Sequence, residues 1–138
     1  MMLKKLATIT IFVKDQNETL RFFTEKLGFE VRDDVTAGDY RWLTVGLKDQ
    51  PDLDLQLAAL KVGGAYDESD IQVLTKLVEA GKMPTSVIKT DNCQKAYDEM
   101  AAKGVEFAYP PTDRPYGIIE AMFKDSNGNR YVLSQDKK

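Results

Sequence analysis

The chain has 138 residues, which suits one domain with a buried core. Apolar residues make up 43% and charged residues 30%, a composition typical of a globular protein and wrong for a disordered one. The net charge of −3 argues against general affinity for nucleic acid, because no basic excess exists to displace counterions. No apolar run approaches the ~20 residues of a membrane-spanning helix, so we expect a soluble, cytoplasmic protein with no membrane partner.

Two residue counts exclude several kinds of site. The sequence contains no histidine, which is the commonest neutral ligand of transition metals and the usual general base near neutral pH. Histidine-dependent triads and histidine-ligated metal sites are therefore excluded. The single cysteine, Cys93, allows neither an internal disulfide nor a thiolate cluster. It lies at the start of an expected helix, and without an activating base we expect it to be inert.

The first sixty residues predict a strand, a helix and three more strands. Residues 6–14 alternate in polarity and are rich in β-branched side chains, which is typical of a strand. Asp15 or Asn17 can cap a helix that follows, and Gly28 can end it. The three later strands are expected at 29–34, 40–47 and 53–59.

Residues 61–83 differ in character from what precedes them. Gly63 and Gly64 form a linker, and an apolar stripe at helical spacing predicts a helix over 67–81. Such an amphipathic helix more often packs on its own domain than docks a partner. The first pattern then returns, with a strand at 85–90, a helix over about 92–103 and strands near 105–109, 116–124 and 129–135.

The return of the pattern indicates an internal duplication. A shift of 76 positions superimposes identical residues at matching turns, helix ends and strand ends. The identical pairs are Asp15 and Asp91, Gly28 and Gly104, Glu30 and Glu106, Tyr40 and Tyr116, Lys48 and Lys124, Asp49 and Asp125, and Leu57 and Leu133. A duplicated β-α-β-β-β unit explains them most simply, and the helix at 67–81 belongs to neither copy.

Two stretches resemble a known family. Residues 12–31 look like an opening signature of strand, Asp, helix and "Phe-Tyr-x-x-x-Leu-Gly-Phe". Residues 123–129 look like a closing "Phe-x-Asp-Pro-x-Gly-Asn" hairpin, with Ser126 where proline is usual. Together with the duplication, these motifs make the chain resemble the vicinal-oxygen-chelate superfamily, which includes glyoxalase I, bleomycin-resistance proteins and extradiol dioxygenases. The fold hosts many unrelated chemistries, so the resemblance says more about fold than about function.

The resemblance implies an α+β fold. In the family, two βαβββ modules form a curled mixed β-sheet cup, and this chain would insert one extra helix between the modules. We therefore expect a single domain over 1–138, with module one at 1–60, an inserted helical linker at 61–83 and module two at 84–138. Cups in the family are often shared between subunits, so the resemblance also implies a homodimer.

The resemblance further places a metal site at four positions. They fall on Thr8, Gln56, Thr85 and Val132, where the family expects mostly histidine or glutamate. Gln56 and Val132 are mates under the 76-residue shift, whereas Thr8 and Thr85 need a slip of one residue. Two hydroxyls, a carboxamide and a valine hold a transition metal poorly, so we expect no metal and no other cofactor.

The same face of each strand supplies the candidate ligand-binding residues, because strand side chains alternate. Aromatic walls with a few polar groups are typical of ligand pockets, although Trp42 could equally pack in the core and Tyr40 and Tyr116 could simply cap the sheet ends. The predicted ligand-binding residues are Thr8, Thr10, Phe12, Tyr40, Trp42, Gln56, Thr85, Lys89, Tyr116 and Arg130.

Glu120 is the candidate catalytic residue. A carboxylate in an apolar strand must be solvated, paired or functional. Glu120 could form an ion pair with Arg130 or Lys89, or recognise a polar ligand. It could also act as a general base if burial raises its pKa.

Three functions stay open. The first is a metal-free protein that binds a small organic molecule in the cup, of the sequestration or resistance type. The second is a metal-independent lyase or isomerase that uses Glu120. The third is a structural or regulatory module whose cup is filled by its own side chains.

Overall fold

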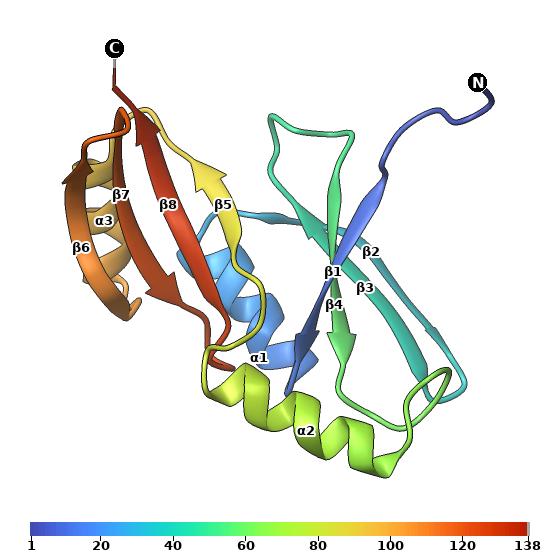
Figure 1. The fold of residues 1–138 in the computed structure, drawn as a ribbon. Coiled ribbons are helices and arrows are strands. Elements are labelled where there is room, and N and C mark those ends of the chain that lie inside the picture. The colour runs from blue at the N-terminus through green and yellow to red at the C-terminus, as the bar shows by residue number, and fades with distance from the viewer. Residues whose placement is uncertain (138) are drawn as a thin grey trace. The chain divides into compact units, whose positions relative to one another are not determined.

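The computed structural model describes residues 1–137 and divides into two compact units. Unit 1 spans Met1–Thr75, and unit 2 begins at Lys76. Each unit contains one four-stranded sheet (Figure 1). No helix within residues 1–137 has the length and apolar character that crossing a membrane requires. The predicted α+β fold, with a βαβββ module in each half and an extra helix between the modules, is confirmed.

Unit 1 contains a mixed sheet in the order β1-β4-β3-β2. Strand β1 pairs with β4 in parallel, and the other pairs are antiparallel. The elements of the first module are β1 (Thr8–Val13), α1 (Gln16–Arg21), the π-helical turn η1 (Phe22–Lys26), β2 (Glu30–Ala37), β3 (Tyr40–Gly46) and β4 (Asp54–Ala59).

Local capping sets the ends of the first helical segment. The Asp15 carboxylate accepts the backbone N–H of Glu18 at 2.9 Å, so Asp15 rather than Asn17 is the cap. Gly28 follows η1 with φ of +74°, as the glycine signal predicted. The change from α-helix to π-helical turn was not predicted, because the apolar spacing is compatible with both.

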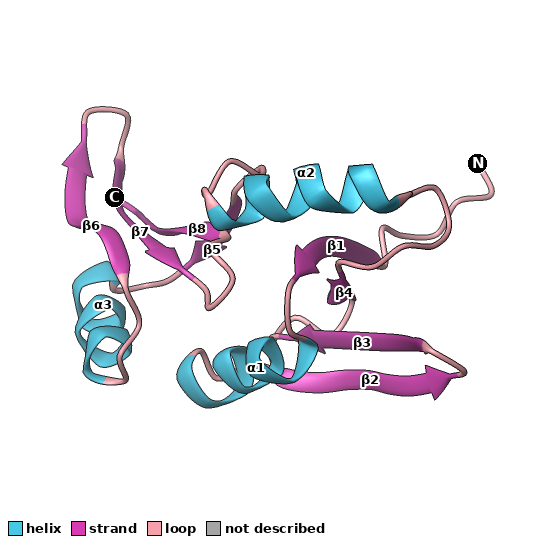
Figure 2. Ribbon diagram, turned by 90° about the horizontal axis from the view of Figure 1, so that it is seen from below, coloured by secondary structure: helices cyan, strands magenta, loops and turns pink. Residues whose placement is uncertain are grey.

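One face of the first sheet packs against α1 and η1 (Figure 2). Phe22 and Phe23 of η1 are buried, and their rings meet edge to face. The sheet contributes alternating side chains that are fully buried, namely Val13, Leu43, Val45 and Leu57. Burying these groups is the main source of stability of this unit.

Helix α2 (Glu68–Glu79) comes after β4 and before β5 in the chain, where the inserted helix was predicted. Asp67 accepts the backbone N–H of Asp70 at 2.9 Å and so caps the helix. Gly81, with φ of +69°, follows its last turn. The side chains of α2 are mostly half-buried or exposed, and within the helix only Val78 is fully buried.

Unit 2 repeats the arrangement in the order β5-β8-β7-β6. Strand β5 pairs with β8 in parallel, and α3 lies along one face of the sheet (Figures 1 and 2). The elements are β5 (Ser86–Lys89), α3 (Cys93–Ala102), β6 (Phe107–Arg114), β7 (Ile118–Lys124) and β8 (Arg130–Asp136). The core between α3 and the sheet includes Cys93 and Met100 of the helix and Phe123, Tyr131 and Leu133 of the strands.

Two strands are longer than the sequence predicted. Strand β2 runs to Ala37, and β6 runs through Pro110 and Pro111 to Arg114. Both are edge strands, and an edge strand tolerates proline because one side of its backbone needs no partner. Register shifts interrupt both pairings, which is how the longer strands stay paired with their neighbours.

Candidate functional site

Each sheet has one face that its own helix does not cover. We call these the helix-free faces of unit 1 and unit 2. In unit 1 the alternation that buries Leu43 and Leu57 under α1 and η1 directs Thr44 and Gln56 to the opposite face. Most of the predicted ligand-binding residues of module one lie on this face.

A chain of hydrogen bonds crosses the helix-free face of unit 1. Thr10 in β1 donates its hydroxyl to Gln56 Oε1 at 2.8 Å, and Gln56 Nε2 donates to the Tyr40 hydroxyl at 3.1 Å. Gln56 is only 9% exposed, whereas Thr10 and Tyr40 are exposed. The structure therefore brings three predicted residues from three strands into direct contact.

The other predicted residues of unit 1 flank this chain. Thr8 lies opposite Asp54 in the pairing of β1 with β4, two residues from Thr10. The Phe12 ring meets the Tyr66 ring edge to face, with 5.4 Å between centroids. Trp42 donates its indole N–H to Asp33 at 3.4 Å. Trp42 is half-buried, so it is not a fully buried core residue.

The four positions that the family uses for metal do not fit a transition ion here. Both ends of the Gln56 carboxamide are already hydrogen-bonded. Val132 lies within β8 and offers no donor atom, and Thr85 is exposed and precedes β5. Within residues 1–137 no three His, Cys, Asp or Glu side chains cluster as metal ligands would. Two weak hydroxyl donors, a carboxamide and a valine leave these four positions without the nitrogen, sulfur or carboxylate ligands that such ions require.

Glu120 anchors the helix-free face of unit 2. It is 8% exposed, and its Oε1 accepts hydrogen bonds from Arg114 Nε at 2.8 Å and from the Tyr116 hydroxyl at 2.9 Å. The Arg114 guanidinium also lies over the Tyr109 ring, 5.2 Å from its centroid. The turn between β6 and β7 is thereby held against the sheet by one carboxylate oxygen.

The sequence allowed an ion pair of Glu120 with Arg130 or Lys89, but in the structure Glu120 pairs with Arg114. Lys89 donates to Ser134 at 3.1 Å and to Asp136 at 2.6 Å. The Arg130 side chain packs on Gly81 instead, and its buried Nε has no hydrogen-bond partner within residues 1–137. Lys89 and Arg130 both lie on the strand face that carries Glu120. Their side chains instead contact Ser134 and Asp136, in the case of Lys89, and Gly81, in the case of Arg130.

The protonation of two groups follows from their surroundings. The hydrogen bond to Glu120 raises the pKa of the Tyr116 hydroxyl, so this phenol keeps its proton and donates a hydrogen bond to the carboxylate. Burial raises the pKa of the Cys93 thiol, with a smaller contribution from the charge of Glu120. A buried thiol with a raised pKa is a poor nucleophile.

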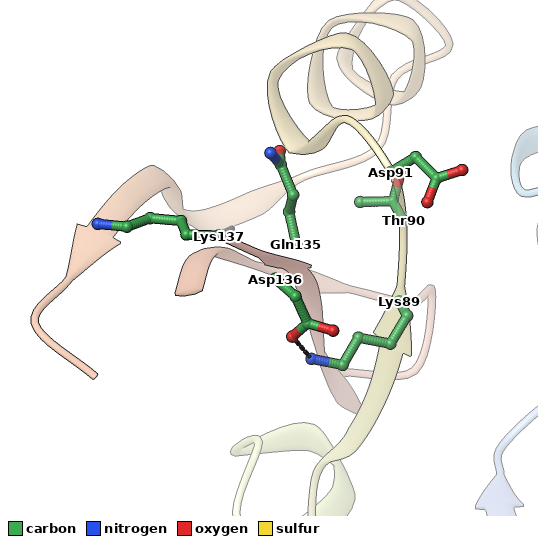
Figure 3. A pocket seen from close by; sticks show the side chains of 6 residues that line it. All are labelled: Lys89, Thr90, Asp91, Gln135, Asp136 and Lys137. Atoms are coloured by element: carbon green, nitrogen blue, oxygen red, sulfur yellow. Dashed lines mark hydrogen bonds and ion pairs between the residues drawn. The ribbon is translucent and has the colours of Figure 1, made fainter. Parts of the chain in front are cut away.

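A polar pocket lies where β5 and β8 end (Figure 3). Its lining residues are Lys89, Thr90, Asp91, Gln135, Asp136 and Lys137. The Lys89 ammonium points to Asp136, and Lys137 pairs with Asp113 at 2.5 Å. Because both ammonium groups are already paired with carboxylates, this pocket offers no unpaired cation to bind an anion.

Sequence reasoning missed Arg114 and Tyr109 as partners in the Glu120 cluster. Arg114 falls between the strands that the sequence predicts near 105–109 and 116–124, whereas in the structure it ends β6 and reaches Glu120 across the hairpin. Thr112, not Arg114, lies opposite Glu120 in the pairing of β6 with β7, so Arg114 reaches the carboxylate diagonally and sequence spacing alone does not indicate the pair. The role of Glu120 as a general base remains a prediction.

Comparison with known proteins agrees with this architecture. The profile of the Glyoxalase/Bleomycin resistance protein/Dioxygenase superfamily matches residues 5–133. The chain is 34% identical over 132 residues to the uncharacterised protein YurT of Bacillus subtilis (strain 168), covering 95% of this chain and 98% of YurT.

Solved structures show the same relationship. The structure of UcmS2 has a TM-score of 0.90 at 38% identity, covering 98% of this chain and 100% of UcmS2. TnmS3, an antibiotic binding protein from Streptomyces sp. CB03234, has a TM-score of 0.77 at 24% identity, covering 99% of each chain. The duplicated modules, the motifs and these matches place the chain in the Glyoxalase/Bleomycin resistance protein/Dioxygenase superfamily.

Proposed function

We propose that the protein binds a small organic molecule on its helix-free sheet faces, without a metal, and acts by holding that molecule. One observation carries the proposal. Each face combines exposed tyrosine with a polar side chain that is more than nine-tenths buried and hydrogen-bonded, Gln56 in unit 1 and Glu120 in unit 2. Apolar walls with a few fixed polar groups are typical of small-molecule sites.

The donor set and the relatives support this proposal. Valine at position 132 and an engaged carboxamide at position 56 disfavour the metal-dependent chemistry known from the fold. TnmS3 is an antibiotic binding protein, and its TM-score of 0.77 shows that it shares the fold of this chain. Occupancy of a fixed site is therefore a function that this fold accommodates.

Thermal denaturation with three naphthalene compounds tests the proposal. The compounds are 2-naphthol, 2-methoxynaphthalene and 2-naphthylmethylamine, which present an aromatic body with different polar groups. A compound that binds only the folded protein increases the free energy of unfolding, by about 2.7 kcal/mol at 100 times its Kd, and so raises the melting temperature. We expect at least one compound to do so and to be recovered chemically unchanged.

Variants locate the binding. Tyr40→Ala and Tyr116→Ala remove exposed rings from the two faces, and at least one should reduce the shift in melting temperature. Val73→Ser, on the exposed side of α2, is the control and should leave the shift intact. The proposal fails if no compound raises the melting temperature or if both tyrosine variants respond like the wild type. If the protein converts a compound and Glu120→Gln abolishes that conversion, the result would instead favour an enzyme that uses Glu120.

A further inference from the structure

The register of unit 2 arranges its helix-free face in two rows. Val87 of β5 pairs with Val132 of β8, and Val132 pairs with Met122 of β7, which makes an apolar row across three strands. A polar row lies two residues further along, formed in the same way by Lys89, Ser134 and Glu120. Two residues of a strand span about 7 Å, so a single small molecule can reach both rows.

Glu120 keeps one oxygen available in the polar row. Arg114 and Tyr116 both donate to Oε1, and Oε2 accepts no hydrogen bond from any residue between 1 and 137. Glu120 is 8% exposed, yet Oε2 is not sealed from solvent. Oε2 therefore belongs to a nearly buried side chain and has no protein donor, so a hydrogen-bond donor from a ligand would be stabilising there.

The charges around Oε2 favour an uncharged donor. Glu120 is paired with Arg114, and Lys89 is paired with Asp136, so the four charges sum to zero. A charged ligand would lose hydration at the polar row without meeting an unpaired opposite charge in that row. A neutral hydroxyl loses less hydration, and its bond to an ionised carboxylate is stronger than a bond between neutral groups.

The apolar row provides a surface that the apolar part of a ligand can cover. Val87 is 59% exposed although it lies in a paired strand, and Val132 and Met122 are half-buried beside it. Covering these side chains with an apolar body removes their surface from water, which contributes roughly 25 cal/mol per Å².

We propose that the helix-free face of unit 2 binds an uncharged organic molecule that carries a hydroxyl group. Its apolar body covers Val87, Val132 and Met122, and its hydroxyl donates to Oε2 of Glu120. This inference rests on the proposed function, since it specifies the ligand class of one of the two faces.

Direct titration of the wild-type protein with the same three naphthalenes is the first test. Dissociation constants are measured from the methyl signals of ¹³C-methionine protein, in which Met122 reports on the apolar row. 2-Naphthol should bind about tenfold more tightly than 2-methoxynaphthalene, which keeps the body and lacks the donor. It should also bind more tightly than the cationic 2-naphthylmethylamine.

Two variants separate the rows. Glu120→Leu should remove the preference for 2-naphthol over its methyl ether, because the acceptor is gone. Val87→Ser should weaken both compounds by a similar factor and keep their ratio. Val73→Ser, with a side chain of matching exposure (57%), and Asp34→Asn, a carboxylate paired with Arg41, are controls that should change neither constant.

The outcomes distinguish this inference from the proposed function. If the three compounds bind but the naphthol and its ether have equal constants, or if the preference survives in Glu120→Leu, the inference is overturned and binding itself stands. Tighter binding of the amine would also overturn it. Should Glu120→Leu fail to fold, the wild-type comparison of naphthol with its ether decides alone.

Discussion

Asp125 shows how much one side chain can organise. Its Oδ1 accepts the backbone N–H groups of Asn127, Gly128 and Asn129 at 2.8 to 3.1 Å, and its Oδ2 accepts the Tyr131 hydroxyl at 2.6 Å. The β7–β8 turn is therefore closed by a single buried carboxylate. This is the physical content of the closing motif, and it explains why serine can stand at position 126, where the family usually has proline.

Tyr131, the partner of Asp125, gives a prediction about alkaline pH. Burial raises the pKa of its hydroxyl well above the usual 10.0, with a further contribution from the Asp125 charge. The folded protein thus holds this proton more tightly than the unfolded chain does. The resulting stability is fully present below pH 10 and is lost as the pH rises above it, because the unfolded chain then releases the proton.

We expect Tyr131→Phe to change the pH profile of stability. At pH 7 the variant should lose about 1 to 3 kcal/mol, because the Asp125 acceptor is left unsatisfied. Above pH 10 its free energy of unfolding should fall less steeply than that of the wild type. Urea denaturation from pH 7 to 11 measures both effects, with Tyr66→Phe as control. Parallel profiles for wild type and Tyr131→Phe would contradict the assignment.

At the scale of elements, glycines differ according to what surrounds them. Gly128 has φ of +112°, and a Cβ there would lie 2.6 Å from the carbonyl oxygen of Val78 at the end of α2. Gly117, in the other hairpin of unit 2, has φ of +87° and nothing within 4 Å of such a Cβ. Both positions resist alanine through backbone strain, but only Gly128 also has a backbone neighbour that cannot move aside.

Gly128→Ala should therefore cost more stability than Gly117→Ala. We expect about 1 to 2 kcal/mol for Gly117→Ala, from the left-handed backbone alone. Gly128→Ala should lose at least about 1 kcal/mol more, because the hairpin and the end of α2 must separate. Urea denaturation of the two variants side by side measures the difference. Equal losses would show that the hairpin does not depend on its contact with α2.

The elements were predictable where their signals are local. Asp15, Asn92 and Gly28 mark helix ends through their own hydrogen bonds or dihedral angles, so the sequence located those ends. The length of β6 was not predictable, because its prolines are tolerated only at a sheet edge. Nor was the pairing of Glu120 with Arg114, which depends on how side chains cross a hairpin and not on their spacing in the sequence.

At the scale of the whole molecule, the duplication kept the fold and changed the details. Asp49 and Asp125 are repeat mates, but Asp49 is exposed while Asp125 closes its turn. In module one the Arg32 guanidinium closes the equivalent turn, because it donates hydrogen bonds to the carbonyls of Leu47, Gln50 and Pro51. A Cβ at Gly46 would collide with this guanidinium. The two modules thus stabilise equivalent hairpins with opposite charges.

The same divergence applies to Gln56 and Val132, which are repeat mates at positions that the family uses for metal. Neither can supply a strong ligand, so we expect the folded protein and its binding of 2-naphthol to be independent of metal. Treatment with EDTA should leave the melting temperature and the naphthol dissociation constant unchanged. Micromolar zinc, nickel or iron(II) should not raise the melting temperature, because a metal stabilises a protein only by binding its folded state. A saturable rise with any of these ions, removed by Gln56→Ala, would mean that the carboxamide gives up Thr10 and Tyr40 to hold a metal.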